Sequence, residues 1–235
     1  MGFDSAPELA LVLLGPESTR LEHVAGVAEA AARARAAVPT DDVALLLAAA
    51  WLHDIGYSAA VTDTGFHPLD GARFLRRIGA PERLCRLVAH HTASPIEATA
   101  RGLHEDLMRE FPPEESPTAD ALTYADMTTG PDGLPVSALE RVLEILTRYP
   151  SEHVVHESIS RARPDLLATV ERVDARLEEV RLRWLTEGDP LSIRLDLEAP
   201  PAGDVDPLSI DPPGHESRDA AAASGQRGGY THRTP

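Results

Sequence analysis

Lysine is absent from the sequence. All 22 basic residues are arginine, they face 38 aspartates and glutamates, and the net charge is −16. No lysine is therefore present to act as a Schiff-base nucleophile or general base. General binding to nucleic-acid backbones requires a basic face, which this charge balance argues against.

Cysteine and long apolar runs are also scarce. The single cysteine, Cys85, excludes an intramolecular disulfide and a cysteine-based zinc site, and it is expected as a small buried residue of a helix. No apolar run approaches the length of a membrane span, and the stretch Leu9 to Leu14 is too short for the core of a secretory signal. The sequence therefore predicts a cytoplasmic protein that does not associate with membranes.

Aromatic residues make up only 4% of the chain, although hydrophobic residues reach 43%. Alanine, leucine and valine supply most of this content, which favours helices that pack through small aliphatic side chains. We expect an all-α fold, a compact bundle of about eight to ten helices over residues 1–186. Residues 187–235 are rich in proline, glycine, aspartate, serine and alanine, and we expect a disordered tail there.

Apolar residues repeat at helical spacing along most of residues 6–184. Ser18 is a suitable N-cap for a long helix that reaches Val38, and Thr40, Asp41 and Asp42 are suitable caps for a helix that ends near His53. The short link makes these two helices antiparallel neighbours, so that His23 can meet His53. Further helices are predicted at 66–77, 82–91, 95–103, 105–110, 119–127, 137–149 and 164–184.

The pair His53-Asp54 stands at the end of a strongly apolar helix. Burying a histidine beside an aspartate is costly unless a positive charge lies against them, and both side chains are good ligands for Zn, Fe or Mn. The partial negative charge at a helix C-terminus also favours a cation there. Gly56 follows at the place where a C-cap glycine would end the helix. A metal site is the simplest interpretation.

Other ligand-type side chains fall at or near the termini of the predicted helices, so that one cavity could collect them. The set comprises His23, His53, Asp54, His67, His90, His91 and Asp126. This order of histidine, His-Asp, histidine, His-His and aspartate resembles the HD-domain superfamily of metal-dependent phosphohydrolases. The resemblance runs from about Leu21 to Met127, and His53-Asp54 corresponds to the signature dipeptide.

The resemblance implies a metal centre and a reaction. His23, His53, Asp54 and Asp126 would hold one divalent ion. The additional histidines His67, His90 and His91 are those of the binuclear members, in which Asp54 bridges two ions. The ions would be Fe, Mn, Zn, Co, Ni or Mg. With His53 and Asp54 as catalytic residues, a metal-activated hydroxide would cleave a phosphomonoester or phosphodiester of a nucleotide or another small molecule.

An acidic chain that binds a phosphorylated substrate also needs local positive charge. Arg73 and Arg101 are the candidates for substrate binding, with Arg76 and Arg77 on the same predicted helix as Arg73. Tyr57 departs from the family pattern, because many relatives have lysine there. The Gly-Tyr-Pro motif of the cyclic-di-GMP phosphodiesterases does not follow His90-His91, so that substrate is not indicated.

Two other classes of function remain open at this point. Some members of the superfamily use the same ligands in a di-iron oxygenase, and a helical bundle can also serve as a non-catalytic signalling or binding module. The complete ligand set favours the hydrolase over both. Substrate identity, the number and kind of metals, and the oligomeric state are not specified by the sequence.

Overall fold

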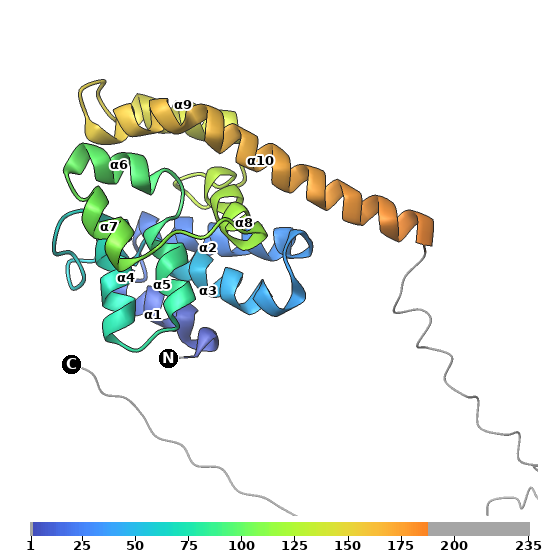
Figure 1. The fold of residues 1–235 in the computed structure, drawn as a ribbon, viewed down its shortest axis with the longest axis horizontal. Coiled ribbons are helices and arrows are strands. Elements are labelled where there is room, and N and C mark those ends of the chain that lie inside the picture. The colour runs from blue at the N-terminus through green and yellow to red at the C-terminus, as the bar shows by residue number, and fades with distance from the viewer. Residues whose placement is uncertain (1, 188–235) are drawn as a thin grey trace, which may run out of the picture. The chain divides into compact units, whose positions relative to one another are not determined.

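A computed structural model describes residues 2–187, which contain helices and no β-strand. This confirms the all-α prediction (Figure 1). The α-helices are α1 (Ala6–Leu14), α2 (Thr19–Arg33), α3 (Val43–Leu52), α4 (His67–Arg77), α5 (Glu82–Ala89), α6 (Ser94–Arg101), α7 (His104–Glu110), α8 (Pro117–Met127), α9 (Ala138–Arg148) and α10 (Val154–Glu187). Short 3-10 helices are η1 (Phe3–Ser5), η2 (Ala34–Ala37), η3 (Thr40–Asp42) and η4 (Ile55–Tyr57).

Helix α3 lies at the centre of the larger apolar core. It is apolar on nearly every side, and it packs against α1, α2, α5 and α8. Helix α2 runs beside it and begins as expected, with the Ser18 hydroxyl accepting a hydrogen bond from the amide of Leu21 at 3.1 Å. A smaller apolar core joins α8 to α9 and α10 through residues such as Met127, Val142 and Ile159. Helices α9 and α10 lie beside each other (Figure 1).

The end of α8 is held against α2 by contact between two stretches of main chain. A Cβ atom at Gly26 would lie 2.2 Å from the carbonyl oxygen of Gly133, and one at Gly133 would lie 2.4 Å from the carbonyl oxygen of Glu22. Gly133 also has a positive φ of 77°, which favours glycine. The turn after α8 therefore rests directly on the backbone of α2.

Three local expectations are corrected. Asp42 does not cap α3 through its side chain; its carboxylate instead binds Arg83 and Thr118. Gly56 is not the C-cap of α3, which ends at Leu52; glycine is required because a Cβ there would lie 2.0 Å from the carbonyl oxygen of His67. The last helix begins at Val154 and contains Pro164 in its interior, ten residues after its start. The lost amide bond at Pro164 is offset by packing on both sides of it.

None of the helices within residues 2–187 has the length and apolar character needed to cross a membrane. The expectation of a disordered tail concerns residues 187–235, which, apart from Glu187, lie outside the described part of the chain.

Candidate metal centre

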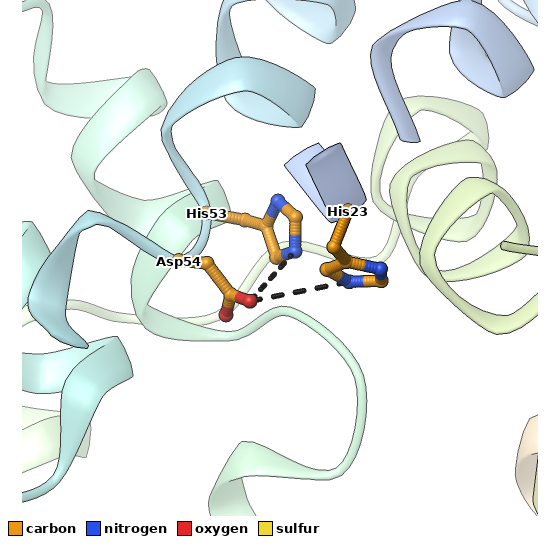
Figure 2. Close-up of side chains that lie close together, drawn as sticks. All are labelled: His23, His53 and Asp54. Carbon is orange, nitrogen blue, oxygen red and sulfur yellow. Dashed lines mark ion pairs between the residues drawn. The ribbon is translucent and has the colours of Figure 1, made fainter. Parts of the chain in front are cut away.

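Four histidines and two aspartates from separate elements converge at one end of the larger core. His23 belongs to α2, His53 and Asp54 follow α3, His67 opens α4, His91 follows α5, and Asp126 is near the end of α8. His23, His53 and Asp54 are almost fully buried and point toward one another (Figure 2). The rings of His23 and His53 are 5.5 Å apart between centroids, so the expected meeting of α2 and α3 occurs.

Main-chain carbonyls orient three of these histidines in the same way. The Nδ1 atoms of His23, His53 and His91 lie 2.9, 2.8 and 2.7 Å from the carbonyl oxygens of Gly130, Ala50 and Val88. A carbonyl oxygen only accepts, so each Nδ1 donates to it and each Nε2 is turned toward the cluster. Histidines that bind metals are commonly oriented by such hydrogen bonds.

The two oxygens of Asp54 face two different pairs of histidines. Oδ2 lies 3.9 Å from Nε2 of His23 and 3.6 Å from Nε2 of His53. Oδ1 lies 3.3 Å from Nε2 of His67 and 3.8 Å from Nε2 of His91. Two groups of potential ligands therefore share this carboxylate. Each oxygen of Asp54 could therefore serve one of the two groups.

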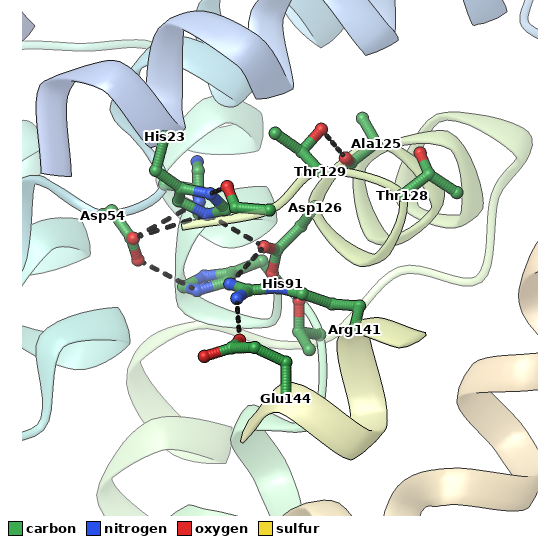
Figure 3. A network of polar contacts seen from close by, with 12 residues as sticks. His23, Asp54, His91, Ala125, Asp126, Thr128, Thr129, Arg141 and Glu144 are labelled. Carbon is green, nitrogen blue, oxygen red and sulfur yellow. Dashed lines mark hydrogen bonds and ion pairs between the residues drawn. The ribbon is translucent and has the colours of Figure 1, made fainter. Parts of the chain in front are cut away.

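Asp126 adjoins the first group and is held from three sides. Its Oδ1 lies 3.1 Å from Nε2 of His23, its Oδ2 accepts a hydrogen bond from the Thr92 hydroxyl, and Nη2 of Arg141 lies 4.0 Å from Oδ1. Figure 3 shows Arg141 reaching this network from α9, with Glu144 beside it. Thr92 has a positive φ of 51°, a strained conformation for a β-branched residue.

The environment sets protonation states that suit metal binding. Burial lowers the pKa of His91 from 6.5 to about 3, and burial also lowers the pKa of His53, so both imidazoles are neutral. Burial alone would raise the pKa of Asp54. Its neighbours His53 and Arg20 outweigh that effect and hold this pKa well below its usual range. Neutral histidines beside an ionised carboxylate are the forms that bind divalent ions.

Burial leaves Nε2 of His53 without a hydrogen-bond partner among the described residues. Leaving such an acceptor unpaired costs on the order of 1–3 kcal/mol. This nitrogen lies 3.6 Å from Oδ2 of Asp54, in a set of nitrogen and carboxylate donors suited to Fe, Mn, Co, Ni or Zn. The residues present therefore fit a divalent metal.

Three of the residues expected at the site lie apart from it. His90 directs Nε2 to the carbonyl oxygen of Phe111, away from its neighbour His91, and lines a separate cavity. Arg73 binds both carboxylate oxygens of Glu110, at 2.8 and 2.6 Å. Arg101 donates a 2.7 Å hydrogen bond to Glu97, which itself lines the cavity beside the metal centre. In each case a nearer acceptor holds the side chain.

Three further side chains complete the site: Arg20, Tyr57 and Arg141. The sequence did not indicate them as site residues. Arg20 donates a 2.6 Å hydrogen bond to Oδ2 of Asp54, and its position one helical turn before His23 is a signal that could have indicated it. Tyr57 stacks on His67 with ring centroids 4.0 Å apart. The Arg20 guanidinium lies 4.2 Å from the centroid of the Tyr57 ring. Arg141 reaches the site only through tertiary packing, so no local pattern in the sequence indicates it.

The fold and site define an all-helical protein with a buried centre of histidine and aspartate ligands. A family model described as HD domain matches residues 20–131, and the cluster of histidines and aspartates is compatible with the metal site of that family. HD domains are in general metal-dependent hydrolases that bind divalent metals. Helices α9 and α10 lie outside the matched residues. No curated protein and no solved structure matches the chain.

Proposed function

We propose that the protein is a metal-dependent phosphohydrolase that acts on a small phosphorylated substrate, such as a nucleotide. The observation that carries this proposal is the shared orientation of His23, His53 and His91, whose Nδ1 atoms donate to main-chain carbonyls and whose Nε2 atoms are turned toward Asp54. Such a set is costly to bury without a cation. The HD domain match supports the same chemistry.

In this proposal His23, His53, Asp54 and Asp126 would hold one divalent ion, and His67 and His91, together with Asp54, would hold a second. Ions held there would lower the pKa of a water molecule and neutralise charge on the phosphoryl oxygens. Hydrolysis joins a water oxygen to phosphorus and breaks the bond to the ester oxygen, which leaves with a proton. His90 is not in the proposed ligand set, because its Nε2 is directed to Phe111.

The residues around the ligands would position the substrate and limit its contact with water. Arg20, Tyr57 and Arg141 line the same cavity as the ligands, which has a volume of about 90 Å³ and is partly open to solvent. The proposal includes a cytoplasmic location, supported by a single cysteine, Cys85, that is a buried free thiol.

The test pairs metal analysis with hydrolysis assays. Protein purified without oxygen should contain close to two metal ions per chain and release phosphate from generic phosphoesters when Mn, Fe, Co, Ni, Zn or Mg is supplied. Asp54→Asn should lose metal and activity while keeping its helical content, whereas Asp41→Asn, at an exposed position, should behave as wild type. Two irons without hydrolysis would instead indicate oxygen chemistry, and a chain that binds no metal would contradict the proposal.

A further inference from the structure

Arg141 is a buried cation contributed by α9, a helix outside the matched HD domain. Only 5% of Arg141 is exposed to solvent. Arginine is almost never buried without partners. The side chain points into the polar network of the metal centre (Figure 3), where its Nη2 lies 4.0 Å from Oδ1 of Asp126. This places a fixed positive charge directly beside the proposed ligands.

Only part of the Arg141 guanidinium is satisfied. Nη1 donates a 2.6 Å hydrogen bond to Oε2 of Glu144, whereas Nε is buried without a hydrogen-bond partner among residues 2–187. Leaving a buried donor of a charged group unpaired costs more free energy than leaving a neutral one unpaired. The edge formed by Nε and Nη2 is the one that arginine offers to two oxygens of a phosphate. A ligand with such oxygens would satisfy it.

The two arginines on this face of α9, Arg141 and Arg148, share a single carboxylate, which favours binding of an anion. Glu144 is shared by two arginines, because its Oε2 accepts from Arg141 and its Oε1 accepts from Nε of Arg148 at 2.8 Å. One carboxylate thus partners two guanidinium groups. Glu97, the acidic residue of the same cavity outside the ligand set, is already paired with Arg101 at 2.7 Å.

Apolar and aromatic side chains also line this cavity. Ile145 and Tyr149 lie near the end of α9, and Val155 and Ile159 belong to α10. An organic group attached to the phosphate would lie against these apolar side chains, with the phosphate at the polar end. The shape therefore suits a substrate with a terminal phosphate and an apolar or aromatic remainder.

We propose that Arg141 is the phosphate-binding residue of this site, and that it receives the terminal phosphate of a phosphomonoester along its Nε and Nη2 edge. A phosphomonoester presents a dianionic group with more free oxygens than a diester, which matches an additional buried cation beside the metal centre. This assignment rests on the proposed function. It also assigns substrate recognition to α9 and α10, which the HD domain match does not include.

The test measures binding rather than turnover. Protein loaded with Mn²⁺ is titrated with inorganic phosphate by calorimetry, and its metal content is measured separately by elemental analysis. Arg141→Gln should weaken phosphate binding at least tenfold and leave the metal content unchanged. Arg141→Lys keeps the charge but lacks the planar edge, so it should recover only part of the affinity.

A matched control is available on α10. Arg181, like Arg141, is paired with a glutamate three residues away, Glu178 at 3.5 Å, but it is 73% exposed at its side chain. Arg181→Gln should bind phosphate as the wild type does. If Arg141→Gln does not fold or does not load metal, Arg141→Lys decides: wild-type phosphate affinity in that variant overturns the proposal, and weakened affinity with full metal content supports it.

A second binding comparison tests whether the site prefers a dianionic phosphomonoester to a monoanionic diester. Phenylphosphonate is a non-hydrolysable dianion, and its methyl ester is a monoanion of similar size. The wild-type protein should bind the first at least tenfold more tightly, and Arg141→Gln should lose most of that preference. Unchanged phosphate affinity in Arg141→Gln with full metal content overturns the Arg141 assignment and leaves the phosphohydrolase proposal intact. A wild-type protein that binds neither metal nor phosphate overturns both.

Discussion

The guanidinium of Arg20 donates a 2.6 Å hydrogen bond to Oδ2 of Asp54, the same carboxylate oxygen that faces His23 and His53. One oxygen is thus shared between an arginine and a candidate metal group. The arginine keeps the aspartate ionised, and it also competes with any ion for that oxygen. The two oxygens of Asp54 are therefore not equivalent, since Oδ1 has only histidines near it among the salt-bridge partners.

Replacing Arg20 should change metal affinity in a defined direction. Arg20→Gln removes a positive charge next to the ligands, so the free protein should bind Mn²⁺ on the order of tenfold more tightly, while its affinity for phosphate falls. Competition with a calibrated chelator measures the first effect and calorimetry the second. Weaker metal binding in Arg20→Gln would show instead that the arginine supports the ligand geometry.

The Thr92 hydroxyl should matter for metal binding although it is not a ligand. Thr92→Val removes the hydrogen bond to Oδ2 of Asp126 at nearly constant volume, and loss of such an outer partner typically weakens metal binding by about 10-fold or more. Thr92→Ser keeps the hydroxyl and serves as the control, with near wild-type affinity. Chelator competition measures the metal affinity of both variants. Because Val has the same β-branched shape as Thr, a weaker affinity in Thr92→Val reports the loss of the hydroxyl and not a change in backbone strain.

The metal-free protein should lose stability in mild acid. The pKa of His91 falls from 6.5 to about 3 on folding, so between these pH values the unfolded chain takes up a proton that the folded chain refuses. The free energy of unfolding should therefore decrease as pH falls below 6.5, by up to about 1.4 kcal/mol per pH unit from this residue. His53, whose pKa is also lowered, acts in the same direction.

Urea unfolding of chelator-treated protein at pH 7.5, 6.5, 5.5 and 4.5 checks this expectation. His91→Gln should show a shallower pH dependence than the wild type, because the variant lacks one of the groups that must stay neutral. A free energy of unfolding that stays constant from pH 6.5 to pH 4.5 would contradict the burial of neutral histidines. Metal-loaded protein should show a steeper acid loss, since protons then compete with the ions.

Gly56 should tolerate no side chain. A Cβ atom there would lie 2.0 Å from the carbonyl oxygen of His67, and that neighbour is main chain that cannot rotate away. Gly56→Ala should lower the free energy of unfolding by at least about 3 kcal/mol. Gly2→Ala is the matched control, because nothing lies within 4 Å of a Cβ at that position. Thermal and urea unfolding of the two variants measure the difference.

Much of the helical framework follows from local patterns in the sequence. The Ser18 cap, the apolar repeat of α2 and the short link to α3 sufficed to predict that His23 meets His53. Such features depend on a few neighbouring residues, which sequence reasoning can read directly. The position of Pro164 was misread as a helix start, because packing on both sides of it outweighs its local preference.

The details of the site depend on contacts that no local pattern contains. His90 and His91 are adjacent and chemically identical, and the end of α5 together with the strained backbone at Thr92 determines which of them faces Asp54. Arg73 looked suitable by composition, yet Glu110 holds it elsewhere. Arg141 comes from a helix that tertiary packing brings to the site.

The contact between Gly26 and Gly133 separates the stability of the core from the spacing between α2 and the end of α8, two properties that core packing usually couples. Main chain rests on main chain there, and the same turn supplies the Gly130 carbonyl oxygen that accepts from His23. The spacing between α2 and the end of α8 is therefore set by peptide groups rather than by side-chain volume. Substitutions among the alanines and leucines of the core can then change the melting temperature while the spacing between His23 and Asp126 stays the same.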